Sequence, residues 1–191
     1  MKSITVKGRE YLFNPEDNSV NVISGRKQWK QRTDFDPLIN VLDENNKIKT
    51  FYFKDAEHFN CVPFENGVGY GIRADYHDWI AEGKKYQLHL RTLIWVHKTT
   101  GRLYFELIPI KEIDNISEIR WPVPYEWKRE DENSYTLFPN FMGMMIPSNW
   151  DTEICNNDYY RFCEAGANMP WYSQVDHTEG YITILATPYD C

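Results

Sequence analysis

Apolar and polar side chains alternate most regularly along two neighbouring segments, residues 86–96 and 103–110. In the first segment, one set of alternate positions is almost wholly apolar: Leu88, Leu90, Thr92, Ile94 and Val96. A period of two is typical of a β-strand that turns one face toward the core. The short stretch between the segments contains Gly101, which favours a turn. The pattern therefore predicts an antiparallel hairpin.

Shorter strand-like runs recur along the chain and are separated by clusters of turn residues. They occupy residues 1–7, 11–13, 20–23, 38–42, 48–53, 68–74, 117–121, 134–138, 142–146 and 181–187. Helical periodicity is nearly absent, and only residues 77–85 are expected to form one or two helical turns. Strands at this spacing are typical of antiparallel sheets packed face to face. We therefore expect an all-β fold, an antiparallel two-sheet β-sandwich, with residues 1–191 as a single domain.

Three glycines at alternate positions, Gly67, Gly69 and Gly71, stand in and before one of these strand-like runs. Glycine weakens a strand, so its repeated presence usually marks a bend or a place where another part of the chain comes very close. We expect one or the other here.

One long segment, residues 147–170, shows neither strand nor helix periodicity. Structureless connections beyond about 15 residues are uncommon in compact domains. Because this one is rich in aromatic residues, we expect it to be ordered against the fold, a ligand or a neighbouring domain. At its end Pro170 fixes the backbone before Trp171 and Tyr172, which predicts a loop tip presenting two rings to a binding partner. Alternatively, Trp171 closes the end of the sandwich.

Composition narrows the class of partner. Aromatic residues make up 16% of the chain; they pack well on pleated sheets, and they also stack on the faces of sugar rings. The formal net charge of −7 argues against nucleic acid, which requires clustered Lys and Arg. No apolar run approaches the roughly 20 residues of a membrane helix, so no membrane partner is expected. The N-terminus lacks the apolar stretch of a signal peptide, which favours a cytoplasmic location.

Known catalytic and metal-binding motifs are missing from the sequence. There is no phosphate-binding Gly-rich loop and no nucleophile elbow. The four cysteines have no C-x-x-C spacing, so free thiols are expected. The run Asp75-Tyr76-His77-Asp78 is interpreted as surface turn residues, and no metal or cofactor is expected. Four carboxylates in the irregular segment could line a site, although no catalytic pair is assigned: Asp151, Glu153, Asp158 and Glu164.

Several short motifs, taken in their order, resemble one family. They are Trp121-Pro122, Met142–Pro147, Asn168–Tyr172 and Gly180–Pro188 followed by Asp190, after an opening Gly8–Leu12 and Ser24–Trp29. The sequence is similar to the N-terminal galactose-mutarotase-like super-sandwich of glycoside hydrolases related to the α-N-acetylgalactosaminidases. The similarity extends over most of the chain.

The resemblance implies that two domains of one polypeptide have different functions. In such bacterial-type enzymes the sandwich precedes an eight-fold βα barrel, which carries the carboxylate nucleophile and the acid/base, and this sequence stops where the barrel should begin. We therefore expect a non-catalytic N-terminal module that packs on a C-terminal barrel of the same polypeptide through an apolar patch. The resemblance also implies that loops of the module close one wall of the carbohydrate pocket. The positions assigned to that wall are Trp150, Arg161, Asn168, Trp171 and Tyr172.

Two other functions stay open at the level of the sequence. The first is an autonomous carbohydrate-binding module that uses the same aromatic residues. The second is a small mutarotase- or epimerase-like enzyme, which needs a positioned acid and base. On the central hairpin, His89, His97 and Glu106 are the candidates for those roles.

Overall fold

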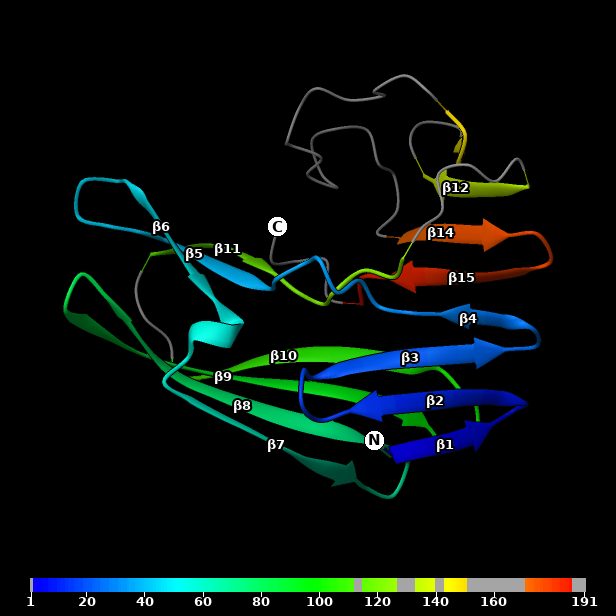
Figure 1. Ribbon diagram of the computed structural model, residues 1–191, viewed down its shortest axis with the longest axis horizontal. Helices are drawn as coiled ribbons and strands as arrows, with labels where there is room; N and C mark the ends of the chain where they lie inside the picture. The colour runs from blue at the N-terminus through cyan, green and yellow to red at the C-terminus, as the bar shows by residue number, and fades with distance from the viewer. Residues whose placement is uncertain (1, 112–114, 127–132, 140–142, 151–170, 187–191) are drawn as a thin grey trace. The chain divides into compact units, whose positions relative to one another are not determined.

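A computed structural model describes residues 2–111, 115–126, 133–139, 143–150 and 171–186 (Figure 1). These residues confirm the all-β expectation, because they form fifteen strands, every strand pairing is antiparallel, and the helical structure is one short 3-10 turn. Within them, no helix has the length and apolar character needed to span a membrane. The chain divides into two compact units, Met1–Glu126 and Trp127–Cys191, which we describe separately.

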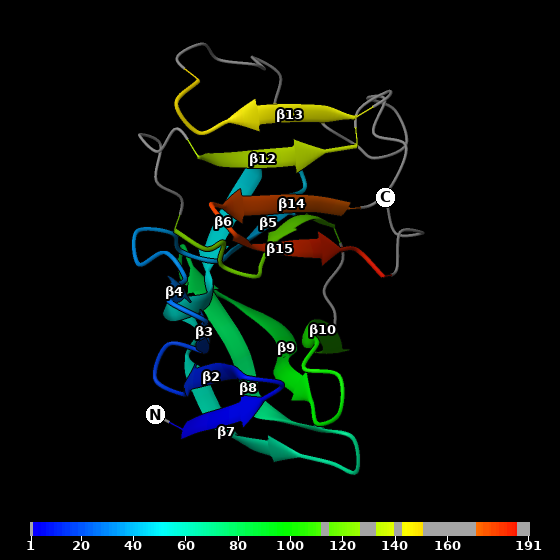
Figure 2. The same ribbon diagram turned by 90° about the vertical axis from the view of Figure 1, so that its right-hand side faces the viewer.

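The largest element of the first unit is a four-stranded sheet with the order β10-β9-β8-β7 (Figures 1 and 2). Its strands are β7 (His58–Glu65), β8 (Gly69–Ala81), β9 (Lys84–His97) and β10 (Leu103–Lys111). Strands β9 and β10 confirm the predicted hairpin, since Val96 pairs with Leu103 across a short turn. The helical turns expected at residues 77–85 are wrong. That segment is the end of β8, a tight turn at Glu82 and Gly83, both with positive φ, and the start of β9.

Two smaller sheets complete the first unit. The first has the order β1-β2-β3-β4, with β1 (Lys2–Val6), β2 (Arg9–Asn14), β3 (Ser19–Ser24) and β4 (Lys27–Trp29). The second has the order β11-β5-β6, with β5 (Leu38–Leu42), β6 (Ile48–Tyr52) and β11 (Ile116–Arg120); the 3-10 turn η1 (Phe53–Asp55) follows β6. These strands confirm the corresponding strand-like runs of the sequence.

Both small sheets pack on the same face of the large sheet. This face carries the alternate positions of β9 that are almost wholly apolar. Toward one end, β1–β3 contribute to a cluster with Ile72, Ile94 and Val96. Toward the other end, β5, β6 and η1 pack against residues of β8 and β9, including Trp79 and Leu90. The core of the unit therefore lies between one four-stranded sheet and two separate sheets that cover it.

The two-sheet arrangement expected from the sequence is not confirmed. The described residues form four hydrogen-bonded sheets, three of them in the first unit. Between Trp29 and Leu38 the chain leaves one small sheet and enters the next, and an isolated bridge joins Gln31 of this segment to Tyr125. The hydrophobic pattern predicts which side of a strand is buried, but it does not predict where ladder pairing is interrupted.

The second unit contains a four-stranded sheet with the order β13-β12-β14-β15. Its strands are β12 (Ser134–Phe138), β13 (Met144–Pro147), β14 (Trp171–Asp176) and β15 (Glu179–Ile184). The loop tip expected at Trp171 and Tyr172 is wrong, because both residues lie in β14 and pair with β15. A tight turn at His177, which has positive φ, joins these two strands. The single-domain boundary over residues 1–191 stays a prediction.

Candidate functional site

The face of the β7–β10 sheet opposite the core carries a cluster of charged side chains. Strand alternation places Arg73, Asp75 and His77 of β8 on this face, beside His89 and Arg91 of the neighbouring strand β9. The position beside Asp75 on β9 is Arg91, and the position beside His77 is His89. The cluster is therefore a product of strand register, since its members are up to 18 residues apart in sequence.

Asp75 is the centre of this cluster. Its side chain is 8% exposed, and its Oδ1 accepts hydrogen bonds from Arg91 Nε at 2.8 Å and from the imidazole of His89 at 3.0 Å. Arg73 Nε lies 3.4 Å from Oδ2. Burial alone would raise the pKa of this carboxyl, but the bonds from His89 and Arg91 and the charges of both arginines lower it below its ordinary value. Asp75 is thus held as a carboxylate.

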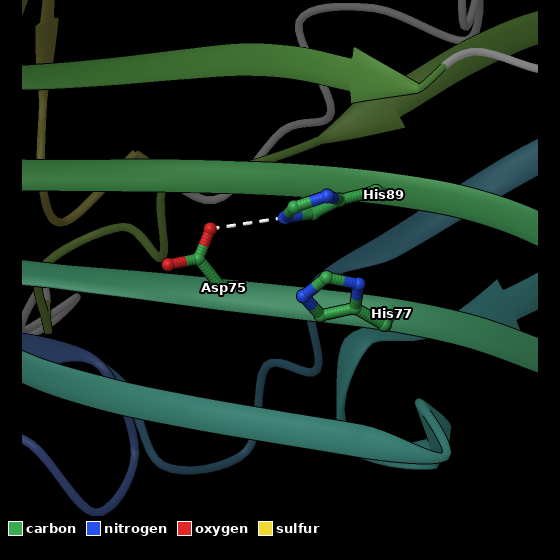
Figure 3. A group of neighbouring side chains, drawn as sticks. All are labelled: Asp75, His77 and His89. Atoms are coloured by element: carbon green, nitrogen blue, oxygen red, sulfur yellow. Dashed lines mark hydrogen bonds and ion pairs between the residues drawn. The ribbon is translucent and has the colours of Figure 1, made fainter.

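Three histidines form a row across the same face. Strand register places His58 of β7 directly opposite His77 of β8, and His77 directly opposite His89 of β9. The rings of His77 and His89 lie 3.6 Å apart between centroids with a 30° angle between their planes. Figure 3 shows the Asp75 carboxylate pointing toward His89 on the neighbouring strand, with His77 on the same strand as Asp75. The interpretation of residues 75–78 as a surface turn is wrong, because they continue strand β8.

A second polar group adjoins this row, and one lysine bridges its two carboxylates. Lys85 Nζ bonds Glu57 Oε2 at 2.8 Å and Asp78 Oδ2 at 2.9 Å. Asp78 has positive φ and lies where the pairing of β8 with β9 shifts register, opposite two residues of β9. The hydrogen bond from Lys85, which is the largest contribution, lowers the pKa of Asp78.

The acid and base candidates for a mutarotase do not converge. His89 and His97 are eight residues apart on one strand, which separates them by about 26 Å. Glu106 pairs with Leu93, midway between them, and is about 13 Å from each along the strand direction. Its Oε1 accepts a hydrogen bond from Trp95 Nε1 at 2.7 Å. These three residues therefore cannot act together on one sugar ring.

The residues assigned to a carbohydrate pocket lie in and around the second unit. Trp150 follows β13 and is exposed. Trp171 and Tyr172 are consecutive in β14, so their side chains point to opposite faces of the β12–β15 sheet. A ligand bound on one face can therefore contact only one of them. Arg161 and Asn168 lie outside the described residues, as do the four carboxylates of the irregular segment.

One face of the β12–β15 sheet is apolar and largely exposed. The face is defined by register: Trp171 pairs with Ile184, and Leu137 pairs with both Met145 and Ser173, which in turn pairs with Ile182. Three of these side chains are strongly exposed: Met145 at 61%, Ile182 at 56% and Ile184 at 62%. The opposite face carries Tyr172, whose ring contacts Tyr181 edge-on. We call the first of these surfaces the Trp171 face.

Comparisons with solved structures show what the fold resembles. The chain matches solved structures of the α-N-acetylgalactosaminidase NagBb from Bifidobacterium bifidum. The complex with GalNAc superposes with a TM-score of 0.84 at 26% identity, and the complex with Gal-NHAc-DNJ with a TM-score of 0.83 at 25% identity. In both cases the match covers 99% of this chain and 30% of NagBb. No family model matches the sequence, and neither does any curated protein.

The matched enzyme is a glycoside hydrolase, and this chain spans less than a third of its length. The chain therefore resembles one domain of a glycoside hydrolase. This supports the relationship to α-N-acetylgalactosaminidases inferred from the sequence, whereas the galactose-mutarotase-like assignment is not confirmed.

Proposed function

We propose that this chain is a non-catalytic module of a glycoside hydrolase and acts by packing on the catalytic domain of the same polypeptide. The observation that carries the proposal is the match of 99% of this chain to 30% of NagBb. More than two thirds of NagBb has no equivalent in this chain, so we place the catalytic domain elsewhere in the polypeptide. We further propose that the module is the N-terminal sandwich inferred from the sequence and that the catalytic domain is a βα barrel.

The Trp171 face supplies a surface suited to such packing. Exposed apolar side chains that cluster on one sheet face are typical of protein contacts rather than of free surface. The face contains no charged residue among its paired positions Trp171, Leu137, Met145, Ile182 and Ile184. Burial of apolar area contributes roughly 25 cal/mol per Å², so covering this face favours a stable contact with a neighbouring domain.

We propose that Trp171 also belongs to the wall of the carbohydrate pocket, with Trp150, Arg161 and Asn168. Tyr172 was assigned to the same wall from the sequence. The strand geometry of β14 turns its ring away from that of Trp171, which favours Trp171 as the contacting residue.

The test compares these two neighbours in the complete polypeptide that contains this chain. Hydrolysis of an aryl α-N-acetylgalactosaminide is measured for the wild type, Trp171→Ala and the matched control Tyr172→Ala. We expect Trp171→Ala to raise KM and Tyr172→Ala to leave it close to the wild-type value. Equal kinetics for all three proteins would remove Trp171 from the pocket, and hydrolysis by residues 1–191 alone would contradict a non-catalytic role.

A second measurement separates the module from an autonomous carbohydrate-binding protein. Titration of residues 1–191 with N-acetylgalactosamine and oligosaccharides is expected to give no saturable binding, because the pocket requires the catalytic domain. Saturable binding at millimolar concentration or below would favour the autonomous module instead.

A further inference from the structure

We propose that Asp75, His77 and His89 bind a divalent transition-metal ion of the Zn²⁺ class on the face of the β7–β10 sheet opposite the core. The site is independent of the glycosidase assignment, because it lies in the first unit and uses none of the residues given to the sugar pocket. Two imidazoles and one carboxylate are a donor set that Zn²⁺ accepts, with solvent in the remaining position.

The spacing of the three side chains suits a single small ion. One donor atom from each residue can be chosen so that all three lie within 4.8 Å of one another. Ligands about 2.0 Å from a tetrahedral ion are separated from each other by roughly 3.3 Å. The His89 nitrogen and Asp75 Oδ1 are already 3.0 Å apart. A small increase in the distance between these two atoms therefore admits the ion. The ion then replaces the proton of their hydrogen bond.

The scaffold holds the ligands in place before any ion arrives. All three residues are in the interior of long paired strands, with Asp75 and His77 on β8 and His89 on β9. Asp75 is nearly buried, and the rings of His77 and His89 already lie 3.6 Å apart between centroids. Sites on rigid strands lose little entropy when they bind a ligand.

The two arginines that contact Asp75 have opposing effects on ion binding. Arg91 fixes the carboxylate through Oδ1 but competes with the ion for the same oxygen and repels it. Arg73, 3.4 Å from Oδ2, has the same two effects more weakly. The neighbouring group consists of Glu57, His58 and Asp78. Lys85 forms ion pairs with both of its carboxylates, so this group is a poorer metal site. His58 lies opposite His77 and is the one additional imidazole within the row.

The experiment is a calorimetric titration of the untagged chain with ZnCl₂, compared with His77→Gln, His89→Gln and the matched control His97→Gln. His97 lies on the same strand and the same face as His89 but eight residues away. We expect one ion per chain for the wild type, affinity reduced more than about tenfold in His77→Gln and in His89→Gln, and unchanged affinity in His97→Gln. Far-ultraviolet circular dichroism and the urea midpoint without metal show that each variant folds.

Two further readouts assign the site. In Arg91→Gln the affinity for Zn²⁺ is expected to rise severalfold, because a competing cation is removed. Co²⁺ in place of Zn²⁺ should give the intense visible absorption of a four-coordinate ion, and His89→Gln should abolish it. The proposal is overturned if the wild type does not bind, if His97→Gln weakens binding as much as His89→Gln does, or if binding survives His89→Gln and is lost in His58→Gln.

Discussion

Gly71 shows at the residue scale why the large sheet requires glycine. A Cβ built on Gly71 would lie 1.9 Å from the backbone oxygen of Ile94 and 2.6 Å from Trp95 Cα. Neither backbone atom can move without breaking the ladder between β8 and β9. The close approach expected from the repeated glycines is therefore confirmed, and at Gly69 it is the ring of Trp95 that occupies the space.

Substituting Gly71→Ala is expected to lower the free energy of unfolding by about 3 kcal/mol, because overpacking against a fixed backbone forces the strands apart. Gly67→Ala is the matched control, since a Cβ there meets nothing within 4 Å; its change should stay within about 0.5 kcal/mol. Urea unfolding followed by tryptophan fluorescence measures both. Equal stability of the two variants would show that the sheet adjusts to the extra methyl group.

Cys61 illustrates how burial controls reactivity at a single thiol. The residue lies in β7 on the core side, opposite Ala74. Burial, with smaller contributions from the Asp17 and Asp75 carboxylates, raises the pKa of Cys61 from 9.0 to about 11. Because the thiolate is the nucleophile, a higher pKa means less reactive thiol at any pH below 11.

At pH 8 we expect iodoacetamide to modify Cys61 on the order of 100-fold more slowly in the folded chain than in the unfolded chain. The rate in the folded chain should keep rising with pH until about pH 11, whereas in the unfolded chain it should level off near pH 9. Mass spectrometry of the peptide that contains Cys61 follows this residue alone. A folded-state rate that levels off near pH 9 would contradict the role of burial.

At the scale of elements, the contact between β9 and the β2–β3 turn depends on one buried polar pair. Asn18 Nδ2 donates a hydrogen bond of 2.7 Å to Thr92 Oγ1, and both side chains are buried. Thr92 is the polar member of the otherwise apolar face of β9, and Asn18 has positive φ in the turn before β3. The pair therefore satisfies Asn18 Nδ2 and Thr92 Oγ1 at the point where the small sheet meets the large one.

Thr92→Val is expected to destabilise the fold by about 2 kcal/mol even though valine favours strands, because it leaves the buried Asn18 amide without this partner. Thr5→Val, at an exposed position of β1, keeps the same change of side chain without the buried partner and should be nearly neutral. Chemical denaturation of both proteins gives the comparison. A neutral Thr92→Val would mean that the amide finds another acceptor or solvent.

Most strands follow from the sequence pattern, and two of the failures have clear physical causes. The β9–β10 hairpin followed from strict alternation over many residues. Strand β7 was missed because Pro63 interrupts its pattern; the strand tolerates proline because it pairs on one side only, at the edge of the sheet. Pro170 favours a loop at Trp171 and Tyr172, whereas the pairing of this segment with β15 depends on register that the local sequence does not reveal.

The histidine row could not be predicted from the sequence, because it also depends on long-range strand register. His58 and His89 are 31 positions apart in the sequence, and their alignment through His77 is visible only once the register of three strands is known. Sequence spacing indicated Asp75 and His77 alone, a pair that surface turns also produce. The pocket residues remain predictions, because two of the five lie outside the described residues.

At the scale of the whole molecule, the Trp171 face determines how the chain behaves when it stands alone. If the catalytic domain covers this sheet face, as we propose, the face is open to other copies of the chain when the chain is alone in solution. Ile182 and Ile184 are its most accessible members on β15. Exposure of this apolar face favours self-association of the chain, whereas repulsion between copies with a net charge of −7 opposes self-association.

The double variant Ile182→Lys/Ile184→Lys is therefore expected to stay monomeric at concentrations where the wild type forms dimers or larger species in sedimentation velocity experiments. The control, Ile48→Lys/Ile110→Lys, adds the same charge at two exposed isoleucines on different sheets of the first unit and should associate like the wild type. If both double variants dissociate equally, added charge rather than the Trp171 face explains the change. If the wild type is itself monomeric at every concentration, the face does not drive association.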